Sequence, residues 1–403
     1  MRWIRRLAKL AMVGAGVLAL LGLLLWVEHN KATTLPVPTG PTAVGRVSYQ
    51  WVNPAKSDPL APTAGAKREV VAWIWYPAKA TASSQRAEYM PAAWRTALSK
   101  YSGPVIGLLT RDMAKVNAHS FADAEVLGAQ QAYPVVLMRA GLGALSTDYT
   151  TLAEDLASHG YVVVGFDAPY RTLTVVFSDG RVVTRRPEDN PETLSSEAAE
   201  KLAERLLVLW CDDAKFLADQ LERLNAGEGD GRFRGRLDLE KLGMFGHSFG
   251  GAQAAEFCHE DARCKAAIDI DGRPFGKVIE EGLQRPFLFL MSDHHGEEKD
   301  AESQRIMEQI QAIYTRLPAK EAALVTIRGT NHFSFSDQIL LKNQMVIATA
   351  RFFGAGGNTD GRRGLRIAAA YVSAFFDRYL KGAAEGEWKK LPTEYPEVTL
   401  ETR

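Results

Sequence analysis

The pentapeptide Gly246–Gly250 places one serine, Ser248, in the pattern Gly-x-Ser-x-Gly. Residues 241–245 before it have the pattern of a short buried strand, and the small residues 251–257 after it are typical of a helix start. A sharp turn between a strand and a helix exposes a serine hydroxyl, and the flanking glycines let the backbone pass close by. Ser248 is therefore predicted to be a nucleophile, which needs a base to act at neutral pH.

His332 is the candidate base, because it follows the predicted strand 324–327 in a loop of glycine and small polar residues. A neutral imidazole within hydrogen-bond reach can take the proton of the serine. His294 and His295 also follow a predicted strand and are the serious alternatives. The other histidines belong to the N-terminal segment, to the half of the chain before the serine, to the position next to it, or to a charged loop.

Two carboxylates could orient the histidine and stabilise its charge. Asp271 follows the predicted strand 266–270, and Asp293 follows the predicted strand 287–291. Both would lie where the carboxyl ends of parallel strands meet, so spacing alone does not separate them. Asp269 alternates with two isoleucines and is interpreted as a structural carboxylate. Either candidate gives the chain order serine, acid, histidine that α/β-hydrolases share, which predicts serine hydrolase chemistry.

An oxyanion hole requires backbone N–H groups aimed at the charge that develops on the carbonyl oxygen. One donor is expected from Phe249, the residue after the serine. A second is expected from Arg139–Gly143, directly after the predicted strand 135–138, with the N–H of Leu142 as the candidate. The alternative is that this glycine-containing segment is an ordinary strand-to-helix turn.

Apolar strands and amphipathic helices alternate along most of the chain, which predicts a mostly parallel sheet flanked by helices. Further strands are expected at 69–76 and 161–166, and helices at 149–159, 197–224, 302–316 and 365–380. Together with the order of the site residues, this alternation predicts the α/β-hydrolase fold. The predicted organisation is a linker with early irregular strands at 31–65, the hydrolase domain at 66–385 with a candidate lid at 86–127 and an insertion at 175–191, and a tail at 386–403.

The first 30 residues differ in kind from the rest, because Leu10–Val27 is a run of 18 residues without a charge. As a helix this run would be ~27 Å long, close to the thickness of a bilayer's hydrocarbon core. The basic residues before it are Arg2, Arg5, Arg6 and Lys9. Residues 27–30 offer no small-x-small cleavage site, so an uncleaved anchor is favoured over a signal segment or a buried helix. The basic end would stay inside, with the catalytic domain exported to the periplasmic or extracellular face.

The charge balance, the cysteines and the lack of metal-binding motifs exclude some classes of function. The chain has 48 basic and 48 acidic residues, and this balance argues against a nucleic-acid-binding protein. Cys258 and Cys264 are six positions apart and are a possible disulfide in an exported chain, whereas Cys211 lies in a predicted helix as a buried thiol. No C-x-x-C or H-E-x-x-H pattern occurs, so neither a metal nor another cofactor is expected.

Six sequence blocks in order between about residues 70 and 340 resemble the plasma-type platelet-activating factor acetylhydrolase family. The blocks are WIWYPA (73–78), AGLGALSTDYTTLAEDLASHGYVVVGFDAP (140–169), GHSFGG (246–251), IDIDGRPFG (268–276), RPFLFLMSD (285–293) and TIRGTNHFSFSD (326–337). The resemblance implies an α/β-hydrolase that removes short or oxidised acyl chains from the sn-2 position of phospholipids without calcium.

The resemblance also implies roles for single residues. It places the nucleophile on Ser248, the base on His332 and the acid on Asp271, with Asp293 kept as the alternative acid. The oxyanion donors implied are those named above. One departure is that the family's His-Gly-Leu-Gly at the oxyanion loop begins here with Ala140. The membrane anchor is another departure, because the lipoprotein-bound members lack it.

The expected function is that of a serine carboxylic-ester hydrolase acting on short-acyl phospholipids, as a 1-alkyl-2-acetylglycerophosphocholine esterase does. A lipid or small ester would be its substrate, and the N-terminal helix would attach it to a membrane. The first alternative is a general carboxylesterase or polyester hydrolase. The second is a non-catalytic hydrolase-fold protein that binds a lipid or a partner, which the presence of all three triad residue types argues against.

Overall fold

In the computed structural model, the described residues are 2–191, 194–293, 301–318, 321–352, 357–388 and 390–403. One large mixed sheet runs through them, with the strand order β1-β5-β2-β3-β8-β7-β11-β12-β13-β14-β15. Its central strands are β8 (Val162–Asp167), β7 (Tyr133–Arg139), β11 (Leu237–His247), β12 (Cys264–Ile270), β13 (Phe287–Ser292) and β14 (Ala322–Ile327). Neighbours in this central set pair in parallel, so their carboxyl ends share one edge of the sheet.

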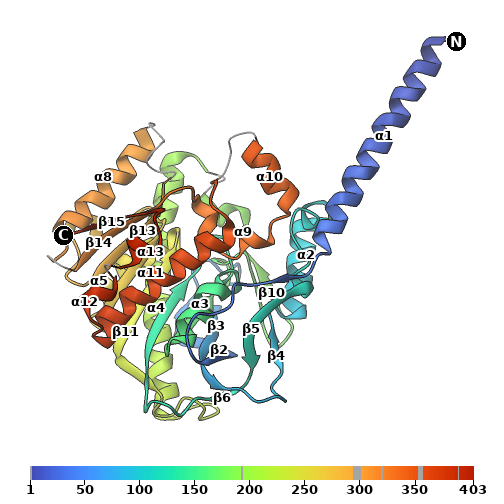
Figure 1. The fold of residues 1–403 in the computed structure, drawn as a ribbon. Helices are drawn as coiled ribbons and strands as arrows, with labels where there is room; N and C mark the ends of the chain where they lie inside the picture. The colour runs from blue at the N-terminus through green and yellow to red at the C-terminus, as the bar shows by residue number, and fades with distance from the viewer. Residues whose placement is uncertain (1, 192–193, 294–300, 319–320, 353–356, 389) are drawn as a thin grey trace.

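Both faces of the central strands are buried, which explains their nearly continuous apolar sequences. Val136 and Met138 of β7 pack in one core cluster, whereas Val135 and Leu137 of the same strand pack in the other. The first cluster includes α3 (Thr150–Ser158) and α11 (Gly361–Lys381), which cross one face of the sheet in Figure 1. The second includes α4 (Ser196–Ala226), α5 (Phe249–Glu260), α6 (Val278–Glu281) and α8 (Ala301–Arg316).

Both flanks of the sheet contain antiparallel pairs, although β5 at one flank pairs in parallel with β1 and β2. β2 (Ala43–Ser57) pairs with β3 (Lys67–Lys79) from Ala43 opposite Ala78 to Ser57 opposite Lys67. Residues 43–57 of the expected linker with early irregular strands therefore form one long strand, whose pairing with β3 continues beyond its short buried stretch. At the other flank β15 (Val398–Thr402) pairs with β14, so the expected tail closes the sheet.

The candidate lid region, residues 86–127, contains several separate elements. It holds α2 (Ala92–Gly107), whose helical geometry is interrupted at Gly103 before Pro104. The region also contributes to the sheet and contains β4 (Arg86–Glu88), η1 (Met113–Lys115), β5 (Val116–Ala122) and β6 (Glu125–Val126). The expected insertion contains a separate antiparallel pair, β9 (Thr174–Val176) and β10 (Val182–Thr184). The other elements are β1 (Thr33–Thr34), η2 (Ser146–Tyr149), η3 (Pro187–Asp189), η5 (His332–Phe335), α9 (Gln338–Leu341), α10 (Gln344–Phe352), α12 (Glu385–Trp388) and α13 (Leu391–Glu394).

The N-terminal helix α1 (Arg2–His29) projects from the domain (Figure 1). Trp3–His29 is long and apolar enough to cross a membrane, and none of the residues in its most apolar window is buried in the structure. Only its carboxyl-terminal end contacts the domain, where His29 Nδ1 donates to the carbonyl of Thr110 at 2.6 Å and Glu28 pairs with Arg111. The helix therefore has the shape of a projecting rod held at one end.

Candidate active site

Ser248 lies at the sharp turn between β11 and α5, with φ of 57° and ψ of −126°. Few residues other than glycine adopt this conformation, and it is the geometry expected of a nucleophile elbow. The two flanking glycines are required by space. A Cβ on Gly246 would lie 1.9 Å from the carbonyl oxygen of Gly250, and one on Gly250 would lie 2.3 Å from that of Arg139. The pentapeptide is therefore a tightly packed turn.

His332 and Asp271 meet across the same edge of the sheet. Asp271 follows β12, and its fully buried carboxylate accepts a 2.8 Å hydrogen bond from Nδ1 of His332. Its other oxygen accepts bonds from the backbone N–H of Ser292 at 2.7 Å and from the Ser292 hydroxyl at 2.8 Å. Because a carboxylate only accepts, the proton of neutral His332 resides on Nδ1. Nε2 therefore keeps the lone pair that a general base needs.

The alternative acid, Asp293, has a different partner. Its Oδ2 accepts a 2.7 Å hydrogen bond from the N–H of Gly329, in the turn that leads to His332. Gly329 has φ of 73°, so this turn also depends on glycine. The structure therefore brings Asp271 into contact with the imidazole and uses Asp293 to hold the loop behind it. The alternative bases, His294 and His295, lie outside the described residues.

A buried histidine connects the base to the loop after β7. Nε2 of His247 lies 2.8 Å from the carbonyl of His332, and its Nδ1 lies 2.7 Å from the hydroxyl of Tyr149. Burial and the adjacent His332 lower the pKa of His247 to about 3, so it is neutral at ordinary pH. The carbonyl only accepts, so Nε2 carries the proton and Tyr149 donates to Nδ1. The Tyr149 oxygen in turn accepts the N–H of Gly141 at 3.3 Å.

The two expected oxyanion donors lie in suitable backbone positions. Gly141 and Ala144 close a turn with a 3.0 Å hydrogen bond, which does not use the N–H of Leu142. A Cβ on Gly141 would lie 3.1 Å from the Cβ of Ser248, so this turn lies directly against the serine. Phe249 is the first residue of α5, and its N–H has no acceptor within the helix. The roles of Leu142 and Phe249 stay predictions.

Comparison with known proteins agrees with this architecture. The sequence profile of "Platelet-activating factor acetylhydrolase, isoform II" matches residues 27–178 and 228–395. The chain belongs to this family. The solved ferulic acid esterase from Streptomyces cinnamoneus superposes with a TM-score of 0.73 at 26% identity, over 92% of this chain and 99% of that chain. The predicted family and the predicted α/β-hydrolase fold are thereby confirmed.

Curated members of the family align with the central part of the chain. The platelet-activating factor acetylhydrolase of Bos taurus is 26% identical over 301 residues, which are 69% of this chain and 63% of that protein. A probable 1-alkyl-2-acetylglycerophosphocholine esterase of Arthroderma benhamiae is 25% identical over 286 residues, which are 68% of this chain and 67% of that protein. The chain thus spans less than two thirds of the bovine relative.

His247, Asp271 and His332 bring potential metal-binding atoms within 4.8 Å of one another. Their hydrogen bonds do not suit a metal centre. Both nitrogens of His247 are engaged with protein groups, and Nδ1 of His332 donates to Asp271. A metal ligand needs a free lone pair at the contacting nitrogen, which these three atoms do not offer. This family member therefore uses the cluster as a hydrogen-bonded unit.

The three cysteines lie outside the hydrogen-bonded cluster of His247, Asp271 and His332. Cys258 and Cys264 form a disulfide that joins the end of α5 to the start of β12. Cys211 is a free buried cysteine in α4, and burial raises the pKa of its thiol well above the ordinary value. Its thiol therefore stays protonated and is a packing group, as the sequence indicated.

Sequence reasoning missed the roles of His247 and Tyr149. His247 was set aside as a base because it is adjacent to the serine, yet its ring centroid lies 4.5 Å from that of His332. Tyr149 is 98 positions before it in the chain, and no local pattern links the two residues. Only the pairing of β7 with β11 brings the loop of Tyr149 to the elbow.

Proposed function

We propose that this chain is a serine carboxylic-ester hydrolase with Ser248 as nucleophile, His332 as base and Asp271 as acid. The observation that carries the proposal is the 2.8 Å hydrogen bond from His332 to the buried Asp271 carboxylate. It supports a base whose Nε2 is free at the same sheet edge as the strained serine turn. This combination matches what acyl transfer by serine requires.

In the proposed reaction, the Ser248 hydroxyl attacks the ester carbonyl while its proton passes to Nε2 of His332. Asp271 stabilises the imidazolium and keeps it oriented. The N–H groups of Leu142 and Phe249 bind the negative oxygen of the tetrahedral intermediate. Collapse of the intermediate releases the alcohol, which takes its proton from His332. Water then attacks the acyl carbonyl and gives a proton to His332. Collapse of this second intermediate releases the acid, and His332 returns the proton to the Ser248 oxygen.

A short-acyl phospholipid of the platelet-activating factor type is the proposed substrate. The printed names of the bovine and Arthroderma relatives describe this chemistry, and the family profile covers both halves of the site. We further propose that α1 anchors the protein in a membrane with the catalytic domain exported. Its apolar length and the ion pair of Glu28 with Arg111, which joins its end to the domain, support this arrangement.

Labelling with a fluorophosphonate tests the catalytic proposal, because this reagent bonds only to an activated serine. The wild-type protein should be labelled and should hydrolyse 1-alkyl-2-acetylglycerophosphocholine. Ser248→Ala should abolish both, whereas Ser178→Ala, at an exposed serine of the β9–β10 turn, should leave both intact. Equal labelling of wild type and Ser248→Ala would contradict the proposal. Absence of any labelling would favour the non-catalytic binding protein.

The ferulic acid esterase that superposes on the chain favours a second candidate, a general carboxylesterase or polyester hydrolase. Both candidates use the same triad and differ only in substrate. Rates on the acetylated phospholipid, p-nitrophenyl butyrate, methyl ferulate and a polyester film separate them. A higher kcat/KM for the phospholipid than for the other esters is expected. The reverse order would make the general esterase the better description.

A further inference from the structure

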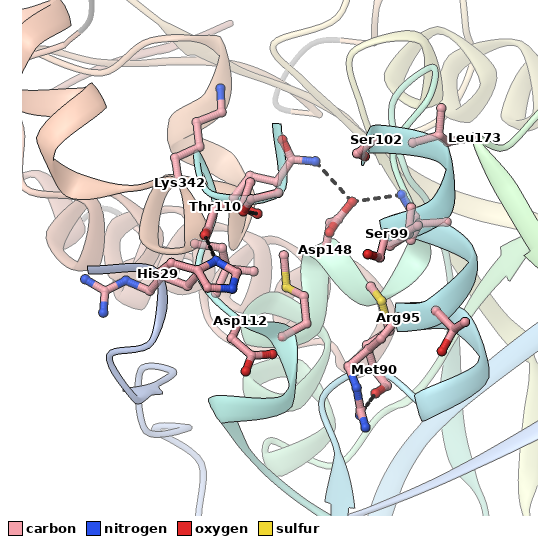
Figure 2. A pocket seen from close by; sticks show the side chains of 18 of the residues that line it. His29, Met90, Arg95, Ser99, Ser102, Thr110, Asp112, Asp148, Leu173 and Lys342 are labelled. Atoms are coloured by element: carbon pink, nitrogen blue, oxygen red, sulfur yellow. Dashed lines mark hydrogen bonds between the residues drawn. The ribbon is translucent and has the colours of Figure 1, made fainter. Parts of the chain in front are cut away.

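A cavity of about 550 Å³ lies between α2, the end of α1 and α9 (Figure 2). Gly143, from the loop that lies against Ser248, contributes to one part of its wall, and His29 of α1 contributes to another. Much of the remaining lining is apolar and comprises Met90, Leu98, Met113, Leu145, Leu173 and Leu341. The cavity is large enough for a flexible hydrocarbon chain and begins beside the expected oxyanion loop.

Lys342 is a cation in this wall that contacts the aromatic ring next to the base. Its Nζ is 3.3 Å from the ring centroid of Phe333, and that ring is in edge contact with the ring of His332. The half-buried ammonium has no carboxylate in hydrogen-bond or ion-pair contact among the described residues. Burial alone lowers its pKa, which agrees with the lack of a neighbouring acid. A cation in this state favours an anionic ligand.

The two arginines of the same wall are already paired. Arg95 lies 3.3 Å from Glu88, and Arg111 is bonded to Glu28 at the end of α1. Their charges are therefore balanced by the protein itself. In Figure 2 the ammonium of Lys342 extends away from His29, whereas the polar atoms around Asp148 bond to one another. Lys342 is thus a partly buried wall cation without a carboxylate partner among the described residues, whereas Lys100 of the same wall is exposed to solvent.

The end of α1 is attached to the segment that carries this lysine. Asn343, the next residue, donates from Nδ2 to the carbonyl of Leu25 at 3.2 Å and to that of Leu108 at 3.0 Å. If α1 crosses a bilayer, this attachment holds the cavity at the membrane surface. Val105 and Ile106, near the end of α2, are 74% and 56% exposed and provide apolar surface there. A lipid could then enter the cavity without crossing water.

We propose that this cavity binds a glycerophospholipid from the membrane, with Lys342 contacting its phosphodiester and the apolar lining holding its sn-1 chain. The inference rests on the proposed ester hydrolysis at Ser248 and adds the group that recognises the substrate. In a glycerophospholipid the phosphate is only a few bonds from the sn-2 ester. His332, the proposed base for an ester at Ser248, contacts the ring of Phe333, and that ring contacts Lys342, so this group of residues is the proposed neighbourhood of the phosphate.

The test uses the full chain in mixed micelles and a matched pair of substrates, 1-alkyl-2-acetylglycerophosphocholine and 1-alkyl-2-acetylglycerol. Lys342→Met should lower kcat/KM for the phospholipid roughly 10- to 100-fold, because a charge-assisted contact is lost. Hydrolysis of the acetylglycerol and of p-nitrophenyl butyrate should change less than about threefold. Lys342→Arg should restore most of the phospholipid activity. Lys67→Met, at an exposed lysine at the start of β3 and outside this cavity, should change the rate on neither substrate.

Three outcomes would overturn the inference. The first is an equal loss of kcat/KM in Lys342→Met on both substrates, and the second is no loss on the phospholipid. The third is a loss seen only with a 1-alkyl-2-acylglycerol whose acyl chain ends in a carboxylate. The last would assign Lys342 to an oxidised acyl chain. Binding of a non-hydrolysable diether phosphocholine to Ser248→Ala gives a readout independent of catalysis. Adding Lys342→Met to that variant should weaken binding at least tenfold. If the wild type shows no esterase activity but Lys342→Met still weakens binding in this way, only the proposed reaction is refuted.

Discussion

The catalytic edge proposed here, which is the sheet edge with Ser248, Asp271 and His332, differs from the cavity beside α2 in the elements that form it. At the catalytic edge, Asp271 and Ser248 follow strands buried on both faces, and the Asp271 carboxylate accepts three bonds of 2.7–2.8 Å. The cavity is lined by a helix interrupted at Gly103, by the end of a projecting helix and by flexible apolar side chains. The first region holds its side chains in fixed positions by hydrogen bonds, and the second presents apolar side chains that can change conformation.

This difference follows from what each region has to do. Acyl transfer loses rate when a reacting group moves by a fraction of an ångström, so its residues need rigid strands and several hydrogen bonds each. A hydrocarbon chain has no fixed shape, so its site needs volume and apolar contact more than exact positions. Substitutions at the edge should therefore affect kcat strongly, and substitutions around the cavity should affect substrate preference or stability.

The largest effect is expected from Asp271→Asn. The amide would still accept from Ser292 but would oppose the Nδ1–H of His332 with an N–H, which favours the wrong tautomer. We expect kcat to fall by about 10⁴-fold. Asp293→Asn is the matched control, because its amide oxygen can still accept from Gly329, and it should retain activity within roughly threefold. If kcat falls more in Asp293→Asn, the acid role passes to Asp293.

Tyr149→Phe tests whether the buried chain through His247 belongs to the rigid edge. The change leaves Nδ1 of His247 and the N–H of Gly141 without their partner. We expect about tenfold lower kcat with little change in KM, and a loss of about 1–3 kcal/mol in the free energy of unfolding. Steady-state kinetics and urea titration measure these quantities.

Tyr371→Phe is the control for that change, since this buried hydroxyl has no hydrogen-bond partner among the described residues. It should leave kcat unchanged and the stability unchanged or slightly higher. A similar kcat in both variants would show that His247 does not position the base.

On the cavity side, Glu28→Gln removes one charge from the ion pair that joins α1 to the domain. The Arg111 side chain is only 8% exposed and that of Glu28 17%, so we expect a loss of about 1–3 kcal/mol in the free energy of unfolding. Glu197→Gln breaks an ion pair with Lys201 whose side chains are 82% and 74% exposed. This change should alter the free energy of unfolding by less than about 0.5 kcal/mol. Thermal unfolding in detergent compares them. Equal shifts would mean that the end of α1 is not held by this pair.

A further effect, a dependence of stability on pH, is expected at Asp148, which lies between the two regions. Burial raises the pKa of this carboxyl from 3.8 to about 6. As pH rises from 4 to 6 the unfolded state releases this proton before the folded state does, so the wild type loses stability, with no further change above the folded pKa. In Asp148→Asn, one amide oxygen can still accept from Leu145 and Gln338. Its stability relative to wild type should therefore increase between pH 4 and 7 by roughly 1–3 kcal/mol. A difference independent of pH would contradict this.

Much of the fold could be predicted because its central strands are apolar on both faces and its helices are amphipathic. The sheet's flanks were harder, because most of β2 alternates half-buried and exposed residues and only its pairing with β3 defines it. At the site, sequence spacing does not distinguish Asp271 from Asp293 as the acid, and the preference for Asp271 comes from the family resemblance. The cavity had no sequence signal, since its wall combines residues from α1, α2 and the loop before α10.

The turn at Ser248 could be predicted from neighbouring residues alone, because two glycines and a short strand define that turn locally. The sequence also determined the apolar N-terminal helix and the order of the site residues. Only the tertiary structure decided which carboxylate meets His332, since 61 positions separate it from Asp271 and parallel pairing brings them together. The same holds for His247 and for Lys342, whose surroundings are contributed by distant segments. Local geometry depends on neighbours in the chain, whereas the partner of a side chain depends on how the strands are ordered.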